Sequence, residues 1–184
     1  MPEPRDYRYR PAAMKDAVAI ANIHAASAHA ALAALVPVAD LRALAATTRS
    51  AKWREAIEFS EPQLQLAVTD AAPGGAAGGA EQCVGFVGYD RSRDPKTAPT
   101  VGEIWALYVL PDYWDQGFGV GLWDAAREGL QEEGCTSVTV WLPLKGERAL
   151  RFFELAGFKR ELSTARTTPV GSVRIEEIRL KRAL

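Results

Sequence analysis

Apolar and polar positions along the chain follow two periods, one typical of strands and one of helices. Alternation and β-branched runs predict strands over residues 7–10, 63–69, 82–89, 102–109, 137–142 and 173–180, with a further one near 158–162. Spacings of three and four residues predict a helix after Asp16, a second one that resumes beyond Pro37 and includes residues 53–59, and helices over 119–133 and 147–156. This order predicts an α/β fold with a mixed sheet.

Glycine-rich and polar segments separate these elements. Residues 70–79 lie between two predicted strands and contain four glycines but no helix start, which favours the flexible tip of a hairpin over a phosphate-binding loop. The polar stretch 90–100 ends the second strand of that hairpin. No segment has the composition of a linker, so the sequence predicts one domain over residues 1–184.

Composition and charge exclude several classes of function. The chain has 184 residues and a formal net charge of -1, so no overall field favours nucleic acid or an anionic membrane. Residues 1–10 are charged and no apolar run is long enough to span a membrane, which predicts a cytoplasmic protein. Cys83 and Cys135 are expected to be reduced and inert, and His24 and His29 lack partners at ligand spacing, so no metal is expected.

The turn over residues 116–121, Gln-Gly-Phe-Gly-Val-Gly, lies between a predicted strand and a predicted helix. Backbone N–H groups at a helix start are unpaired and carry partial positive charge, and glycine lets a ligand approach them closely. Leu122 follows where a Walker A loop needs lysine, and the glycine spacing differs from a dinucleotide-binding fingerprint. The turn therefore predicts an anion site for another phosphate-bearing ligand; glycines that serve close packing alone are the alternative.

Three segments together resemble the GNAT N-acetyltransferase family. They are Glu-Ile-Trp-Ala-Leu-Tyr-Val-Leu-Pro over residues 103–111, the pattern Gln116-x-x-Gly119-x-Gly121, and Ala-Leu-Arg-Phe-Phe-Glu-Leu-Ala-Gly-Phe over residues 149–158. The resemblance implies a mixed, mostly antiparallel central sheet flanked by helices, with a splayed central strand pair. It also implies one acyl-CoA N-acyltransferase domain and acetyl-CoA as co-substrate.

The resemblance also implies site residues. It assigns contacts with acetyl-CoA to Leu107, Tyr108, Val109, Gln116, Gly117, Phe118, Gly119, Val120, Gly121 and Phe153. It makes Glu103 the candidate base that removes the proton of the attacking amine. Strand alternation is expected to place Tyr108 opposite Leu107 and Glu103, in the core. His24 and Trp105 are candidate substrate contacts, with packing in the core as the alternative for both.

Two residues depart from the family pattern. Phe153 stands where the family often has a tyrosine acid, and Gly146 stands where it has asparagine. The thiol of CoA has a modest pKa, so its thiolate leaves without much help and the loss of these two residues need not abolish turnover. An N-acetyltransferase acting on a small amine or amino acid is therefore the first hypothesis. A protein or peptide acetyltransferase and a non-catalytic acyl-CoA sensor are the alternatives. A homodimer is possible, through pairing at the edge strand 173–180.

Overall fold

The computed structural model describes residues 7–43, 46–69 and 81–184, and their side chains apart from residues 42–49. Helices occupy Ala17–Leu32 (α1), Val38–Ala43 (α2), Ala46–Phe59 (α3), Phe118–Glu132 (α4) and Glu147–Leu155 (α5). Strands occupy Tyr7–Pro11 (β1), Gln63–Thr69 (β2), Gln82–Arg91 (β3), Val101–Val109 (β4), Ser137–Pro143 (β5), Lys159–Arg160 (β6), Arg166–Val170 (β7) and Val173–Ala183 (β8). Short 3-10 turns lie at Met14–Asp16, Pro111–Tyr113 and Leu162–Thr164.

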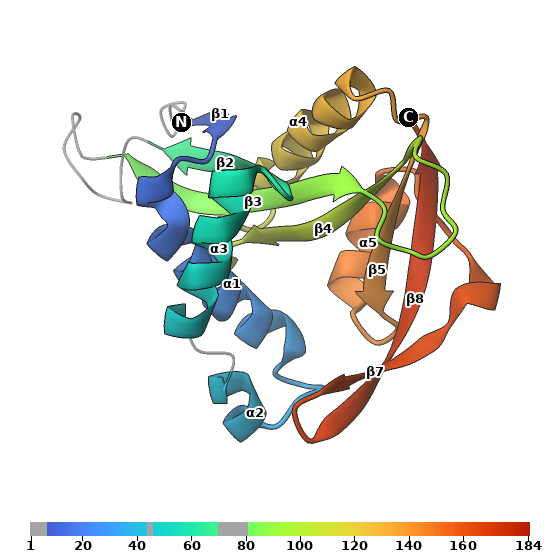
Figure 1. Ribbon diagram of the computed structural model, residues 1–184. Helices are drawn as coiled ribbons and strands as arrows, with labels where there is room; N and C mark the ends of the chain where they lie inside the picture. Colours follow the sequence, from blue (N-terminus) through green and yellow to red (C-terminus); the bar gives the residue numbers. More distant parts are fainter. Residues whose placement is uncertain (1–6, 44–45, 70–80) are drawn as a thin grey trace.

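The strands form one sheet in the order β1-β2-β3-β4-β5-β8-β6, and β7 also pairs with β8. Only the pairing of β4 with β5 is parallel among the described residues; the other pairs are antiparallel. The predicted mixed, mostly antiparallel sheet flanked by helices is confirmed (Figure 1).

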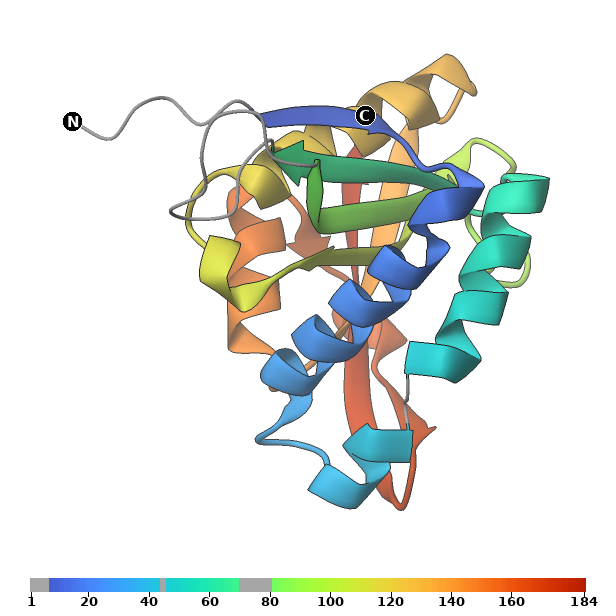
Figure 2. The same cartoon turned by 90° about the vertical axis from the view of Figure 1, so that its left-hand side faces the viewer.

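Helices cover the two faces of the sheet differently. Leu122, Trp123, Leu130, Leu150 and Phe153 of α4 and α5 pack on one face, which we call the α4/α5 face. Helices α1 and α3 pack through Ile20, Ile23 and Ala56 on the other, the α1/α3 face, but only over β2 and β3 and the adjoining part of β4. Figure 2 shows α1 and α3 in front of the sheet, and the lower part of β8 extends beyond them.

The two central strands separate part-way along their length. Pairing of β4 with β5 runs from Val101 opposite Ser137 to Ile104 opposite Val140 and then stops. Both strands continue beyond this point, and Figure 1 shows them diverging. The splayed strand pair therefore opens directly after Ile104 and Val140.

A β-bulge in β4 corrects one prediction. Gly88 pairs with Ala106 and Tyr89 with Ile104, so Trp105 has no partner in β3. Ile104 packs on the α4/α5 face, so its neighbour Glu103 points to the α1/α3 face, where Tyr108 also packs. The prediction that Tyr108 lies opposite Glu103 is wrong, because simple alternation omits the extra residue. The prediction that Tyr108 and Leu107 point to opposite faces is confirmed.

Other differences are local. The chain beyond Pro37 forms two helices, α2 and α3, rather than one. Strand β7 was not predicted, and the strand expected near residues 158–162 is only two residues long. The predicted hairpin is confirmed by the pairing of β2 with β3, whereas its tip, residues 70–79, lies outside the described residues.

Candidate active site

The glycine-rich turn forms the start of α4. Gly117 is the N-cap residue, with φ of 87° in the left-handed region that glycine adopts without strain, and no side chain caps the helix. A Cβ at Gly117 would meet no atom within 4 Å, so the backbone is open on that side. The turn therefore presents uncapped N–H groups to an open approach, and these suit an anion.

Two residues of the turn, Phe118 and Gly121, pack against tyrosine rings, whereas Val120 is exposed. Phe118 is 4% exposed and lies edge-on to Tyr7 and Tyr113, each with ring centroids 5.7 Å away. A Cβ at Gly121 would lie 2.1 Å from the ring of Tyr9. Phe118 and Gly121 therefore set the packing of the turn, and the N–H of Gly121 already donates to the carbonyl oxygen of Gly117, at 3.1 Å.

Arg148 is the cation that the structure brings to the turn. Its guanidinium lies 4.2 Å from the ring centroid of Trp114 and 2.8 Å from Asp115 Oδ1. Trp114 in turn donates its indole N–H to the carbonyl oxygen of Val109, at 2.8 Å. The fold rather than local sequence brings these groups together, because Arg148 belongs to α5 and its contacts to the segment before α4.

The open edge of β4 carries the three strand residues assigned to cofactor. Leu107 packs against the α4/α5 core, and Tyr108 packs on the other face. The carbonyl oxygen of Val109 already accepts from the hydroxyl of Ser27, at 3.0 Å, as well as from Trp114. The carbonyl oxygen of Val109 is thus occupied, so Leu107 is better placed than Val109 to bond a ligand through its backbone.

Glu103 is buried, with 2% of its surface exposed, and is held by Arg93. Its carboxylate accepts from the backbone N–H of Arg93 at 2.9 Å and from Nε at 3.2 Å. The same guanidinium lies 4.0 Å from the ring centroid of Trp105. The predicted base and one predicted substrate contact thus share a partner that sequence spacing did not indicate.

His24 lies among aromatic rings on the α1/α3 face. Its ring centroid is 4.7 Å from that of Tyr108, 5.6 Å from Trp53 and 6.2 Å from Phe86. The structure therefore brings His24 together with Tyr108. His24 is half-buried, so it is both part of the packing and open on one side.

A second cluster of charged and aromatic residues lies further along the same face, and sequence reasoning missed it. Trp141 donates its indole N–H to Asp94 at 3.1 Å, and Arg166 lies over its ring at 3.5 Å from the centroid. Arg179 binds both Asp94 and Glu161. These residues come from five separate segments, so no local pattern in the sequence indicates the cluster.

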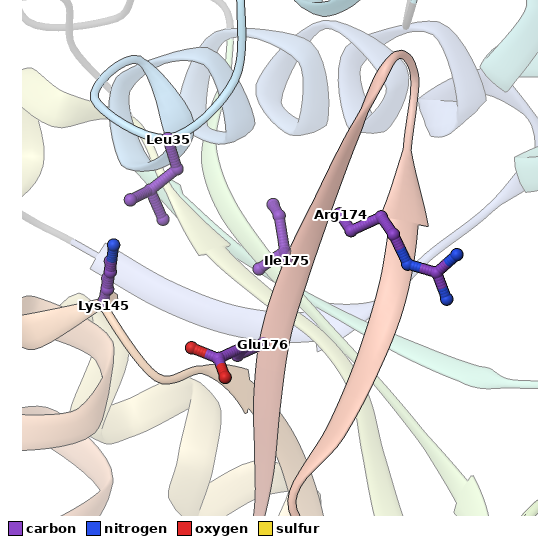
Figure 3. A pocket seen from close by; sticks show the side chains of 5 residues that line it. All are labelled: Leu35, Lys145, Arg174, Ile175 and Glu176. Carbon is purple, nitrogen blue, oxygen red and sulfur yellow. The ribbon is translucent and has the colours of Figure 1, made fainter.

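A small pocket lies beside this face, where the loop after α1 meets β8 and the segment between β5 and α5 (Figure 3). Leu35 and Ile175 supply its apolar wall, and Lys145 and Glu176 supply charge. Figure 3 shows the guanidinium of Arg174 turned away from Leu35, so only the stem of Arg174 faces the pocket.

Phe153 and the two cysteines lie within packed regions. Phe153 is 4% exposed and lies 5.1 Å from the ring centroids of Phe152 and Phe158. Burial raises the pKa of the Cys83 thiol to about 12 and also raises the pKa of Cys135. Both thiols are free and protonated at neutral pH, so neither is suited to nucleophilic attack.

Comparison with known proteins identifies the family. A model of the acetyltransferase (GNAT) family matches residues 39–158. The chain belongs to the GNAT acetyltransferase family. A search of curated proteins found no match to the sequence. Within the GNAT family, the matched segment includes the splayed strands, the glycine-rich turn and α5.

Solved structures share the GNAT fold over nearly the whole chain. The PaiA N-acetyltransferase of Thermoplasma acidophilum, in complex with coenzyme A, has a TM-score of 0.73 at 15% identity, covering 97% of this chain and 99% of that one. YncA of Salmonella typhimurium, with acetyl-CoA, has a TM-score of 0.69 at 15% identity, covering 97% and 94%. A ribosomal-protein-alanine N-acetyltransferase of Brucella melitensis has 0.69 at 16% identity, covering 96% and 99%.

The described residues show neither a membrane-spanning helix nor a cluster of metal ligands. No helix among the described residues is long and apolar enough to cross a membrane. In the same part of the chain, no group of three or more His, Cys, Asp or Glu side chains is placed to hold a metal ion.

Proposed function

We propose that this GNAT protein transfers an acetyl group from acetyl-CoA to the primary amine of a small molecule or amino acid, by direct attack, within one domain over residues 1–184. The observation that carries the proposal is the uncapped start of α4 at Gly117 beside the open edge of β4. The first fits a pyrophosphate and the second fits an extended chain of amides. Acetyl-CoA supplies the activated acetyl group.

The chain's own residues hold the cofactor mainly through backbone. In the proposal, N–H groups over residues 116–120 bind the pyrophosphate, and Arg148 adds a formal positive charge to the partial charge of the helix start. The backbone of Leu107 binds the pantetheine arm or the acetyl carbonyl, where a fixed N–H stabilises the negative charge that develops on the thioester oxygen. Phe153 offers at most an apolar edge, because its ring is almost fully buried.

Glu103 is the proposed base, because an amine must lose its proton to attack a thioester. Its burial on the α1/α3 face, directly before the point where the strands separate, supports this role. Arg93 occupies the carboxylate in the described state, so proton transfer requires Arg93 to move aside or a water molecule to relay the proton. His24 and Trp105 stay proposed contacts of the acceptor on that face.

Three broader properties are also proposals: a cytoplasmic location, no resident metal, and a homodimer. The expectation that the dimer forms at an edge strand over residues 173–180 is wrong, because β8 pairs with β5 on one side and with β6 and β7 on the other. A protein or peptide substrate and a non-catalytic sensor are the competing functions. The sensor is favoured by one observation, since Phe153 brings no hydroxyl to protonate a leaving thiolate.

The experiment that tests the proposal is calorimetry of acetyl-CoA binding to the wild type and to Gly119→Trp. A Cβ at Gly119 would lie 3.2 Å from the ring of Phe152, so an indole at this position must turn toward the ligand side of the turn. We expect the variant to bind at least about 100-fold more weakly, because it blocks several charge-assisted hydrogen bonds at once.

Leu155→Trp is the matched control, since Leu155 is 78% exposed on α5 and the change also adds a surface indole. It should bind acetyl-CoA as the wild type does. Absence of binding by the wild type would exclude the acetyltransferase function, and equal binding by Gly119→Trp would move the phosphate site elsewhere.

A further inference from the structure

Unused hydrogen-bond donors gather on the α1/α3 face. The indole N–H groups of Trp53 and Trp105 are buried and have no partner among the described residues. Arg166 donates through Nε to Glu177, while within the described part of the chain its two terminal nitrogens bond to nothing, and its side chain is 47% exposed. Buried donors are rarely left unpaired, so a ligand on this face is expected to bring acceptor atoms.

Each central strand carries a tryptophan directly where the two strands separate. Ile104 and Val140 are the last paired residues of β4 and β5, and the next residue in each strand is a tryptophan, Trp105 and Trp141. Each indole carries a guanidinium on its face, Arg93 at 4.0 Å and Arg166 at 3.5 Å. Under the proposed function the reacting thioester lies in this opening, so both guanidinium groups flank the acceptor.

Four carboxylates on this face are already occupied by arginine side chains. Glu103 accepts from Arg93, Glu177 accepts from Arg166, and Asp94 and Glu161 accept from Arg179. The side chains of these four carboxylates are 3%, 19%, 13% and 30% exposed, respectively. The groups with spare hydrogen-bonding capacity toward solvent are therefore mainly donors, those of Arg166 in particular.

The net charge of this network and its spare hydrogen-bond donors favour different groups on a ligand. The network has four carboxylates and three arginines, so its formal charge favours a ligand with a positive group. Its spare donors favour a ligand with carboxylate or similar oxygens. An amine that also carries a carboxylate meets both requirements, since it enters as a zwitterion.

We propose that the acyl acceptor is an amine bearing a carboxylate, of the amino acid class, and that Arg166 binds this carboxylate while stacked on Trp141. This inference rests on the proposed acetyltransferase function. Arg166 is then a specificity-determining residue. The indole N–H of Trp105 adds a second donor beside the splayed strands, and the amine of the acceptor lies toward Glu103.

The test compares acceptors that differ only in the carboxylate. The probes are leucine against 3-methylbutylamine, phenylalanine against 2-phenylethylamine, and 4-aminobutyrate against butylamine and 1,4-diaminobutane. Product formation is followed by mass spectrometry and by release of the CoA thiol. We expect the carboxylate member of at least one set to have a kcat/KM about 10- to 100-fold higher, since one charge-assisted hydrogen bond strengthens binding by about this factor.

Arg166→Gln is expected to remove this preference by raising KM for the carboxylate acceptor about 10- to 100-fold, with little change for its decarboxylated counterpart. Arg166→Lys should recover part of the loss, because it keeps the charge. Arg160→Gln is the matched control: Arg160 pairs with Glu154 of α5 and, opposite Leu180 in register, points to the other face. Melting temperatures of all variants report whether they fold.

The outcomes separate the two proposals. Equal rates within every set, a preference for the diamine, or acetylation of none of the probes by a protein that binds acetyl-CoA would overturn the carboxylate inference alone. Failure to bind acetyl-CoA in calorimetry would overturn the proposed function itself. An Arg166→Gln variant that loses both members of a pair equally would show that Arg166 supports the fold rather than the carboxylate.

Discussion

The glycine-rich turn and the α1/α3 face differ in how their chemistry is built. The turn draws on consecutive residues and presents uncapped backbone N–H groups, with Phe118 packed inward. The face is built almost wholly from side chains, contributed by the segment after β3, by β4 and β5, by Glu161 before the last 3-10 turn, and by β7 and β8. Backbone donors suit a phosphate shared by a whole family, whereas side chains vary with the acceptor.

The turn and the α1/α3 face are also expected to be sensitive to different kinds of mutation. A backbone site is damaged by bulk that blocks it or by packing that moves it. A side-chain site is damaged by loss of one charge, because buried partners are then left unpaired. Substitutions at each region therefore distinguish them.

The largest effect is expected on the α1/α3 face, from Glu103→Gln. If Glu103 takes the proton of the amine, kcat should fall about 100-fold or more, the contribution typical of general base catalysis. KM for acetyl-CoA should stay unchanged, since the carboxylate does not face the turn. Steady-state kinetics at saturating acetyl-CoA measures both.

Glu154→Gln provides the control for Glu103→Gln, because Glu154 forms an ion pair with Arg160 on the other face. It should leave kcat as it is. A Glu103→Gln protein that folds and retains wild-type kcat would show that the carboxylate only anchors Arg93.

A smaller effect is expected at the turn, from Gly121→Ala. The new Cβ would lie 2.1 Å from the ring of Tyr9, so the ring or α4 must move, which costs about 1–3 kcal/mol of unfolding free energy. Denaturant titration measures the loss. In a double-mutant cycle with Tyr9→Ala the two changes should be strongly coupled, since removing the ring removes the clash.

Additive effects in that cycle would place the role of Gly121 in ligand binding rather than in packing. The comparison with Gly119→Trp is then direct, because the two glycines lie two residues apart in the same turn and are assigned opposite roles.

The smallest effect is expected from Phe153→Tyr, which restores the hydroxyl of the family pattern. The ring lies between Phe152 and Phe158 and is 4% exposed, so a hydroxyl there has no route to a thiolate unless the packing changes. We expect little change in kcat. A large gain would instead indicate an acid-deficient enzyme and strengthen the view that the natural protein acts as a sensor.

Local pattern was enough for the elements near the turn. The strand over residues 102–109, the glycine-rich turn and the helix after it were predicted within one residue at every boundary, because alternation, glycine and helical spacing are all local properties. The family resemblance depends on the same local residues. It also predicted the splayed strand pair, which the pairing of β4 with β5 confirms.

Tertiary structure decided the face of each side chain and its partners. The bulge at Trp105 moved Glu103 to the face of Tyr108, and no period in the sequence marks an inserted residue. The partnership of Arg93 with Glu103 crosses the connection between β3 and β4, and that of Arg166 and Arg179 with Trp141 joins segments further apart in the chain.

The sequence by itself thus determined the elements and the glycine-rich helix start that we propose binds an anion, since backbone donors at a helix start depend only on neighbouring residues. Only the fold could determine the α1/α3 face, where we propose the acceptor binds. Its charges and rings gain their meaning from distances between strands, and those distances follow from sheet order and register rather than from position along the chain.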